Sequence, residues 1–292
     1  MDESEFSEKF IVFFDVLGWK HHVTTSNQGR GLSIQELEEV IAALGSDEDR
    51  KHFEKYGPTI CPEAPRIRND LDFRITVASD CAIVSAEISP SGLINLVSHC
   101  WTACLKLLTK GMMCRGYIKR GRIHHTDKHQ FGTGLNEVID GEKNVSIFRQ
   151  DADDRGTPFI EVDKEVIRYV EEQQDKCVKE MFSRMVKVEG DLAAIFPFER
   201  LNHSFMIGGF GVEFDPEKER TSLNNVRGWI HNMKDEVTRH IDSSDASVVR
   251  KGDHYIRLLD AQLVACDRTE EMIEMLCQPF PARQLGDITK KT

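Results

Sequence analysis

Two aspartates stand where a carboxylate could carry out chemistry. Asp15 ends the apolar run at 10–16, which predicts a buried strand. Asp80 lies between two alternating runs, 73–78 and 81–85, which predict a hairpin with the aspartate at its turn. If the two strands are neighbours, the carboxylates converge and could hold a divalent cation such as Mg²⁺. The alternatives are a capping role for the first aspartate and an ordinary turn position for the second.

A dense group of cations and a glycine-rich segment follow the hairpin. Four basic side chains fall within eight residues of an acidic chain: Arg115, Lys119, Arg120 and Arg122. Beside a metal site they would suit a triphosphate, whereas on an edge strand they would only prevent unwanted pairing. The segment at 131–136, FGTGLN, could let a phosphate or ribose approach backbone amides, or could simply begin a helix.

Composition sets the class of protein. The chain has 292 residues, 38 Lys and Arg against 49 Asp and Glu, and a net charge of −11, which fits one large domain or two small ones. The acidic balance disfavours the coating of DNA or RNA, and no apolar stretch approaches the ~18 residues of a membrane span. The first residues lack the order of a signal peptide, so we expect a cytoplasmic protein. Its eight cysteines are then expected to be free thiols, and to be small buried hydrophobes rather than zinc ligands.

The elements that must position these residues alternate between strand and helix. A capping box at 33–36 begins a helix, and a long polar connection is expected over 45–70. After the hairpin, the spacing of apolar residues predicts a helix over 89–111, a strand over 112–118 and a short helix over 135–144. This order predicts an α+β fold in which helices pack on one face of a mixed sheet.

The pattern changes after about residue 157. A long helical pattern over 163–188 follows a short strand, and further helices are expected over 216–241 and 247–266. We therefore divide the chain into a catalytic domain at 1–165 and a helical extension at 166–292 that packs on the core.

Taken together, the motifs resemble the catalytic domain of class III nucleotidyl cyclases. The family has an opening strand with a metal-binding aspartate, a hairpin turn, a strand with arginine and glycine, and an aromatic-glycine segment that ends in asparagine. In this chain they are matched in the same order by 13–18, 79–81, 115–121 and 131–136. The resemblance covers roughly 10–165 and implies a ferredoxin-like core. Within the superfamily the chain looks most like the bacterial Pycsar pyrimidine cyclases of anti-phage defence, which also carry a C-terminal helical extension.

The resemblance implies an enzyme, a phosphorus–oxygen lyase that converts UTP to 3′,5′-cyclic UMP and pyrophosphate. The product would act on a separate effector protein. Asp15, Asp80 and the carbonyl of Val16 would hold two divalent cations, Mn²⁺ or Mg²⁺, which activate the ribose 3′-hydroxyl and neutralise the triphosphate. The family site lies between two subunits, which implies a homodimer with neither nucleic acid nor a membrane as a partner.

The same resemblance assigns the remaining site residues. Asn136 matches the family asparagine that positions the ribose. Arg115 and Arg120 are candidates for stabilising the transition state, because Asp140 stands where the purine cyclases have an arginine. Substrate contacts are expected at four further positions, the first two of which select the base: Thr76, His129, Arg74 and Phe14.

The identity of the base stays open at this point. Thr76 and His129 match neither the adenine pair nor the guanine pair of the family, which disfavours ATP and GTP. A threonine hydroxyl can donate or accept, so CTP is an alternative to UTP. A purine-using class III cyclase is a further alternative, as is a degenerate cyclase that only binds a nucleotide as a sensor. The two metal carboxylates oppose the sensor hypothesis, whereas Asp140 supports it.

Overall fold

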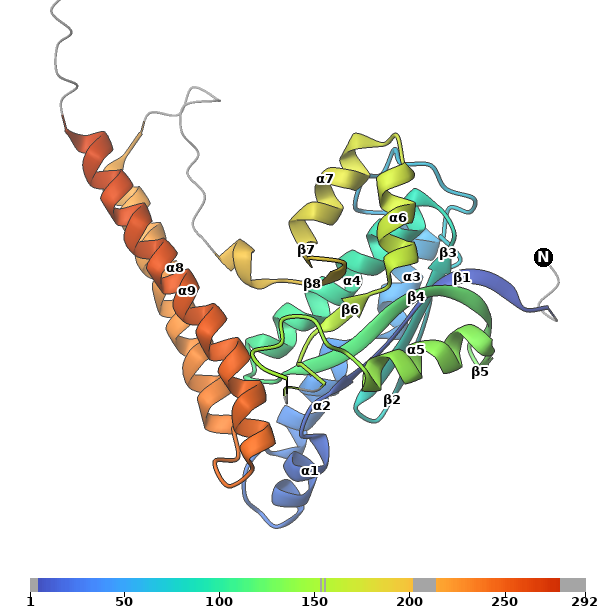
Figure 1. The fold of residues 1–292 in the computed structure, drawn as a ribbon, viewed down its shortest axis with the longest axis horizontal. Helices are drawn as coiled ribbons and strands as arrows, with labels where there is room; N and C mark the ends of the chain where they lie inside the picture. The colour runs from blue at the N-terminus through green and yellow to red at the C-terminus, as the bar shows by residue number, and fades with distance from the viewer. Residues whose placement is uncertain (1–4, 153, 155, 202–213, 279–292) are drawn as a thin grey trace, which may run out of the picture.

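The computed structural model describes residues 5–152, 154, 156–201 and 214–278, which form one mixed sheet with helices packed around it (Figure 1). The strands are β1 (Ser7–Val16), β2 (Arg74–Ala78), β3 (Cys81–Glu87), β4 (Cys114–His125), β5 (Gln130–Phe131), β6 (Ile160–Val162), β7 (Val186–Glu189) and β8 (Leu192–Ile195). The helices are α1 (Trp19–Asn27), α2 (Ile34–Leu44), α3 (Asp47–Tyr56), α4 (Pro90–Leu108), α5 (Thr133–Lys143), α6 (Lys164–Glu172), α7 (Lys176–Met185), α8 (Pro216–His240) and α9 (Ala246–Cys277), with a 3₁₀ turn, η1 (Phe198–Leu201). The predicted α+β class is confirmed.

The main sheet has the strand order β2-β3-β1-β4-β6-β8-β7, with β5 paired to β4 off this path. All pairs are antiparallel except β4 with β6, so the sheet is mixed as predicted. The part from β1 to β4 has the connectivity β-α-β-β-α-β, which is that of ferredoxin-like folds. The predicted hairpin of β2 and β3 is confirmed, and β3 lies beside β1.

Helices cover both faces of the sheet, so the prediction of one covered face is wrong. Phe10, Val12 and Phe14 of β1 point to one face and share a buried cluster with residues of α2, α4, α6 and α7. Ile11 points to the other face and is buried under Leu135 of α5. The reason is that both alternating sets of side chains in β1 are apolar, and an apolar set must be covered on either face. Each such buried side chain contributes about 1.5–3 kcal/mol.

The segment after residue 165 does not begin a helical extension. The pattern predicted as one helix over 163–188 is two helices, with an extended Gln173 between them and Asp175 capping the second. Strands β7 and β8 then pair as a hairpin and extend the sheet from β6. Val186 and Ile195 of these strands are buried in the same core as β1. The sheet is therefore continuous across the boundary at 165, and the helical extension consists of the later helices.

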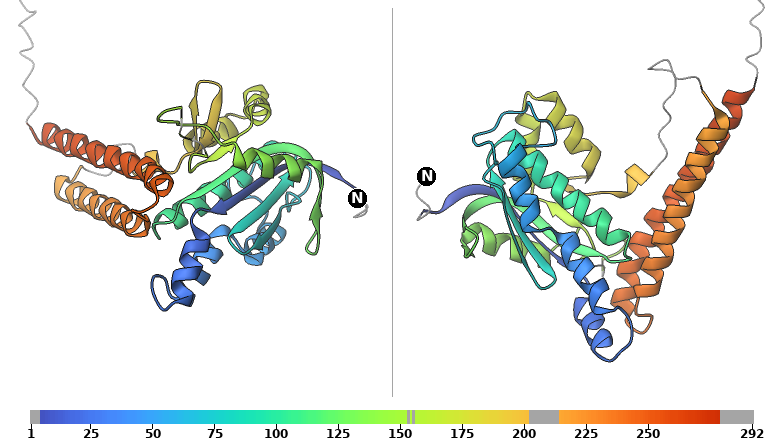
Figure 2. Two further views of the ribbon diagram at one scale, coloured as in Figure 1. Left: turned by 60° about the horizontal axis from the view of Figure 1, so that its bottom comes forward. Right: turned by 180° about the vertical axis from the view of Figure 1, so that it is seen from behind.

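Helices α8 and α9 form an antiparallel hairpin at one side of the sheet (Figure 2). Leu223 and Ile230 of α8, with Leu259 of α9, are fully buried in a cluster that also contains residues of α4, β8 and η1. Asp154 and His254 of α9 are joined by a buried contact of 2.7 Å between a carboxylate oxygen and the ring Nε2. The hairpin is thus fixed to the sheet by apolar burial and by a polar contact.

The segment predicted as a long connection at 45–70 contains the helix α3. Ser46 and Asp49 form a capping box at its start, a signal that was available in the sequence. Cys61 and Cys177 form a disulfide with a Cα–Cα distance of 6.0 Å, so the expectation that all thiols are free is wrong for this pair. The expectation of small buried hydrophobes is confirmed for Cys100, Cys104 and Cys114.

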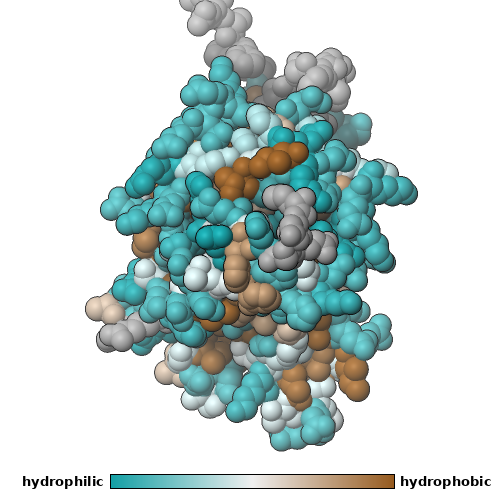
Figure 3. All heavy atoms as spheres, turned by 90° about the vertical axis from the view of Figure 1, so that its right-hand side faces the viewer, coloured by the Kyte–Doolittle hydropathy of each residue, from teal (hydrophilic) through white to brown (hydrophobic). Residues whose placement is uncertain are grey.

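The face turned to the viewer in Figure 3 is largely hydrophilic, with small and separate hydrophobic patches. In the part of the chain that the structure describes, no helix is both long enough and apolar enough to cross a membrane.

Candidate functional site

The two aspartates singled out in the sequence meet at one end of the sheet. Asp15 lies opposite Cys81 in the antiparallel register of β1 and β3, so it sits beside the turn that carries Asp80. The backbone N–H of Val16 donates a 2.9 Å hydrogen bond to the carbonyl oxygen of Asp80. Ser79 takes the left-handed φ of 56° that this two-residue turn requires. The predicted convergence of the two carboxyl-bearing segments is therefore present.

The carboxyl group of Asp15 shares a hydrogen bond with Glu142 but has fewer partners than a buried charge needs. It is half-buried, and its Oδ1 atom has no hydrogen-bond partner among the described residues. Burial raises the pKa of Asp15, and the nearby charges of Glu142 and Asp80 raise it further, while Arg115 lowers it. Acidic groups outnumber cations here, and a divalent cation is the ligand that would relieve this imbalance.

Arg115 lies opposite Asp15 across β1 and β4, yet its guanidinium is bound to Glu142 at the end of α5. Glu142 is buried. The motif resemblance assigns this glutamate no role, although an acidic residue in the last turn of a helix is unfavourable without a partner. Arg115 is therefore held at the site by Glu142 rather than reaching out as a mobile cation.

A cavity of about 590 Å³, here named the aspartate cavity, opens where Asp15 and Asp80 meet. Its walls come from the end of β1, helix α1, the β2–β3 turn, the residues before β4, and the ends of α8 and α9 that face each other across the turn of the hairpin. His22 faces this cavity, and burial lowers its pKa to about 4, so it adds no positive charge at neutral pH. The volume is within the range of small-ligand sites.

The predicted cationic patch on β4 is not an open patch. Lys119 pairs with Glu137 at 2.9 Å, and Arg120 makes two contacts of 2.8 and 3.0 Å with Glu8. Because Arg115 and Lys119 point to the α5 face while Arg120 points to the other, these cations do not converge on one ligand. Strand β4 pairs with β6 only over Gly116–Ile118, so Lys119, Arg120 and Arg122 lie on a part of β4 that pairs with β1 alone. This placement fits the edge-strand alternative for these three cations.

The glycines of the segment 131–136 serve packing. A Cβ atom on Gly134 would lie 2.6 Å from Ile11 Cδ1 and 2.9 Å from the carbonyl carbon of Gly121. A Cβ atom on Gly132 would lie 2.5 Å from the carbonyl oxygen of Arg122. These glycines allow α5 to begin in close contact with β4, which favours the helix-start interpretation.

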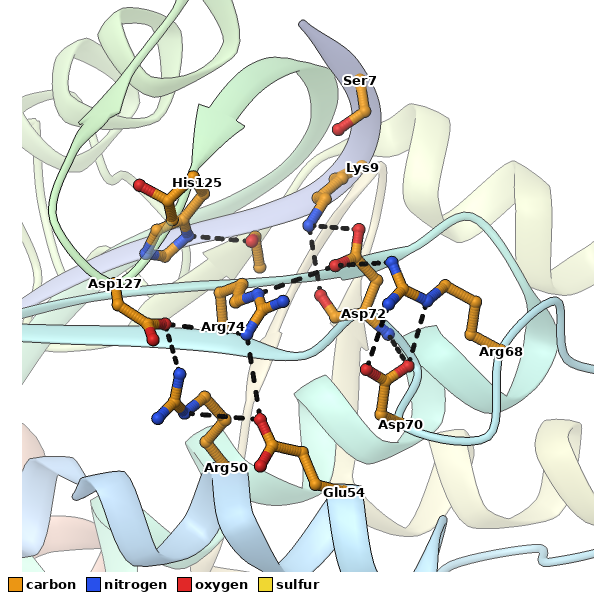
Figure 4. Close-up of polar contacts among 12 residues, drawn as sticks. Ser7, Lys9, Arg50, Glu54, Arg68, Asp70, Asp72, Arg74, His125 and Asp127 are labelled. Carbon is orange, nitrogen blue, oxygen red and sulfur yellow. Dashed lines mark hydrogen bonds and ion pairs between the residues drawn. The ribbon is translucent and has the colours of Figure 1, made fainter. Parts of the chain in front are cut away.

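A second hollow, of about 1460 Å³, lies at the opposite end of the strands and is here named the ion-pair hollow. Asp72 binds Lys9 at 2.6 Å, Arg68 at 3.4 Å and Arg74 at 3.7 Å, all measured between charged atoms (Figure 4). Arg74 also lies 3.6 Å from Asp127, which binds Arg50. Here each buried charge has partners supplied by the chain itself.

The expected base-selecting residues lie toward the ion-pair hollow. Thr76 Oγ1 is 3.1 Å from Nε2 of His125, whose Nδ1 is 2.9 Å from Ser85 Oγ. Burial lowers the pKa of His125 to about 3, and the charges of Lys9 and Arg74 contribute, so the ring is neutral. His129 lines the same hollow and is exposed.

The sequence-predicted residues therefore divide into two groups. Asp15, Val16 and Asp80 line the aspartate cavity, whereas Arg74 and His129 line the ion-pair hollow. Lys9 and Asp15 mark the two ends of β1, and six residue steps along a strand span about 20 Å. Within one chain, a single small molecule could not touch both groups.

Three other predicted residues have definite places. Phe14 has no exposed surface and packs in the hydrophobic core, so it is a core residue rather than a substrate contact. Asn136 is exposed on the first turn of α5. Asp140 is exposed on the same helix and lies 3.2 Å from Lys143.

No protein-family model and no curated protein matches this chain. Over the described ranges, no group of three or more His, Cys, Asp or Glu residues is arranged to hold a metal ion. Two carboxylates with one backbone carbonyl are nevertheless a sufficient protein share for Mg²⁺, which keeps waters and takes phosphate oxygens as its other ligands. The residues of the aspartate cavity thus fit a divalent cation whose remaining ligands are water or phosphate oxygens.

Proposed function

We propose that the chain is a metal-dependent nucleotide cyclase that converts UTP to 3′,5′-cyclic UMP and pyrophosphate. The observation that carries this proposal is the meeting of Asp15 and Asp80 at one cavity, with a carboxylate oxygen of Asp15 buried and unpartnered among the described residues. The motif resemblance to class III cyclases, and to the Pycsar pyrimidine cyclases in particular, supplies the reaction. The connectivity from β1 to β4 is compatible with the ferredoxin-like core of that family.

In this proposal Asp15, Asp80 and the carbonyl of Val16 hold two divalent cations, Mn²⁺ or Mg²⁺. Bound cations would lower the pKa of the ribose 3′-hydroxyl and neutralise charge on the triphosphate. The ribose 3′-hydroxyl loses its proton to water, and its oxygen attacks the α-phosphorus. The bond between the α-phosphorus and the oxygen that bridges to the β-phosphorus breaks, and pyrophosphate leaves with that oxygen. The share of the chain is to fix the two carboxylates on a strand end and a tight turn, so that the substrate is held in line.

The separation of the two groups of site residues supports a homodimer. In one chain the metal carboxylates line the aspartate cavity, whereas the base-selecting His129 lines the ion-pair hollow at the other end of the strands. Thr76 lies between them, level with Phe13 of β1. A head-to-tail pair would place the exposed Asn136 and the Thr76 region of one copy against the aspartate cavity of the other. Each copy would then complete the site of its partner, which gives two active sites per dimer.

The choice of a pyrimidine base depends on Thr76. Its hydroxyl is held by the neutral ring of His125, so it presents a short hydrogen-bonding side chain where the purine cyclases have longer ones. UTP is the proposed substrate and CTP the nearest alternative, since a hydroxyl serves either base edge. The cyclic nucleotide would act on a separate effector protein in anti-phage defence.

The test is to incubate the purified protein with each of the four nucleoside triphosphates, with Mn²⁺ and then Mg²⁺, and to identify products by mass. Cyclic UMP that disappears with Asp80→Asn supports the proposal, and cyclic CMP would change only the base. Cyclic AMP or cyclic GMP would contradict the pyrimidine assignment. The matched control is Asp267→Asn, which removes an exposed carboxylate of α9 that pairs with Arg227.

One observation favours a second candidate, a nucleotide-binding sensor without turnover. The arginine of the family is replaced by Asp140, and Arg115 and Arg120 are bound to acidic partners. A sensor would bind UTP in the presence of Mn²⁺ with the same dependence on Asp15 and would release no pyrophosphate. Pyrophosphate release measured beside equilibrium binding separates the two functions.

A further inference from the structure

The hairpin of α8 and α9 forms one wall of the aspartate cavity. Val237 and His240 of α8 and Val248 and Lys251 of α9 line it, and Asp245 lies at the turn between them. Figure 1 shows this end of the hairpin beside α1, and His21 of α1 lies 4.0 Å from Asp242 of the turn. The extension therefore contributes side chains to the same space as Asp15 and Asp80.

Lys251 is the cation that this wall presents. It is half-buried, and the structure gives it neither a hydrogen bond nor an ion pair within the described ranges. Asp15, Asp245 and Glu142 attract its ammonium group through space, while Arg115 repels it. Burial lowers the pKa of Lys251, so the charged ammonium group lacks full compensation.

Of the other cations near the cavity, Lys20 of α1 also lines it but is exposed, and three more are already engaged. Arg115 is bound to Glu142, and Lys110, which follows α4, is bound to Glu39 at 2.6 Å. Lys234 of α8 is bound to Asp260 at 2.5 Å. Lys251 thus combines a place in the cavity wall with an ammonium group that no acidic residue in the described ranges holds.

A chain of phosphates fits this arrangement. The carboxylates of Asp15 and Asp80 on one wall suit divalent cations, and a bound cation attracts phosphate oxygens. An ammonium group on the wall formed by the hairpin would meet the remaining phosphate charge as a point charge. An uncharged or cationic ligand would leave Lys251 uncompensated.

We propose that Lys251 of α9 binds the phosphate chain of the nucleotide in the aspartate cavity, so that the C-terminal hairpin is part of the substrate site. This inference rests on the proposed function for its substrate. It assigns to the hairpin a direct contact with the ligand, in addition to its packing on the sheet. It also places a cation near the phosphates that the motif comparison did not predict.

The test measures binding of inorganic tripolyphosphate to the full chain by calorimetry in the presence of Mn²⁺. Lys251→Met removes the charge and keeps the unbranched stem, so the packing of the stem is preserved. We expect it to weaken binding on the order of tenfold or more, as for a lost hydrogen bond to a charged group, and Lys251→Arg to restore most of the affinity. Arg257→Ala is the matched control, because it removes one positive charge from an exposed position on the same helix.

The outcomes separate this inference from the proposed function. Equal affinities for Lys251→Met and Arg257→Ala, with both melting like the unmodified chain, would overturn the inference, as would a chain that does not bind tripolyphosphate. Tripolyphosphate binding that depends on Lys251, in a protein that cyclises no nucleotide, would support the inference and contradict the proposed function. If Lys251→Met does not fold, Lys251→Gln carries the same test.

Discussion

The two ends of the sheet treat charge in opposite ways. At the ion-pair hollow, Asp72 is surrounded by Lys9, Arg68 and Arg74, and each charge is met by the chain itself (Figure 4). At the aspartate cavity, Asp15 has an unpartnered oxygen, and Lys251 has no acidic partner in the described ranges. The first end is built to be stable as it stands, and the second is built to be completed by a ligand.

This difference follows from the cost of burying charge. A buried ion that is paired and hydrogen-bonded is tolerated, whereas an uncompensated one costs several kcal/mol. An uncompensated buried charge is therefore expected where a ligand binds and neutralises it. We therefore expect substitutions of the acidic residues at the aspartate cavity to reduce function without loss of stability, and substitutions of the charged residues at the ion-pair hollow to reduce stability.

The largest effect is expected for Asp15→Asn. Loss of a metal-binding carboxylate removes several kcal/mol of transition-state stabilisation, so turnover should fall roughly 1000-fold or more. The free energy of unfolding should rise, because the repulsion from Glu142 and Asp80 is relieved. Product formation and urea unfolding, measured on the same preparation, check the expected loss of turnover and the expected gain in the free energy of unfolding. A variant that loses stability together with activity would contradict the comparison.

A change of opposite character is expected for Asp72→Ala. Lys9 is buried, and without Asp72 its ammonium group loses its carboxylate partner. The free energy of unfolding should fall by about 3–5 kcal/mol, as for other broken buried pairs. Urea unfolding measures this, and Lys9→Met in the same background should recover part of the loss. An unchanged urea midpoint for Asp72→Ala would contradict the claim that the ion pairs of this hollow stabilise the fold.

The packing of the α8–α9 hairpin against the residues before β4 can be tested by substituting two glycines. Gly111 has a φ of 70°, and a Cβ atom there would lie 2.5 Å from the backbone of Glu236 in α8. Gly190 has a φ of 60°, and a Cβ atom there would meet nothing within 4 Å. Both alanine variants should pay about 1–2 kcal/mol for the left-handed backbone, and Gly111→Ala about 1–3 kcal/mol more for the clash.

Thermal unfolding ranks the two alanine variants. Gly111→Ala should also weaken tripolyphosphate binding, because it moves the wall that carries Lys251. Equal stability and equal affinity of the two would show that the hairpin does not need to sit against the residues before β4.

A pH dependence is expected from the ion-pair hollow. The folded chain holds the pKa of His125 at about 3, below the ~6.5 of an unfolded chain, so the unfolded state binds more protons between these values. The free energy of unfolding should therefore fall as the pH is lowered from about 7 toward 4. His125→Asn should reduce that slope, with His129→Asn, an exposed neighbour, as its control. Equal slopes for the two variants would contradict the assignment.

The local parts of the fold could be predicted from the sequence. The strand ending at Asp15, the hairpin turn at Asp80 and the capping box at Ser33 follow from the spacing of neighbouring residues. The polar composition and the glycines and prolines of 45–70 predict a connection there, whereas the structure places α3 in its first half, with Ser46 at the start. The strands β7 and β8 are short, and their pairing with β6 depends on contacts that periodicity does not encode.

The surroundings of the candidate site could be predicted only in part. The convergence of Asp15 and Asp80 followed from adjacent strands, but the binding of Arg115 by Glu142 joins a strand to the end of a distant helix. The place of Lys251 beside Asp15 depends on how a hairpin more than two hundred residues along the chain packs back on the sheet. Such contacts depend on the full three-dimensional packing.

The most direct test of the account is the binding of Mn²⁺ to the nucleotide-free protein, followed by electron paramagnetic resonance. The account predicts that Mn²⁺ binds, that Asp15→Asn and Asp80→Asn each abolish this binding, and that Asp72→Asn leaves it intact under conditions where the variant is folded. Two results would contradict the claim that the aspartate cavity is a metal site. One is that Mn²⁺ does not bind the unmodified protein, and the other is that it binds the Asp15→Asn and Asp80→Asn variants as tightly as the unmodified protein.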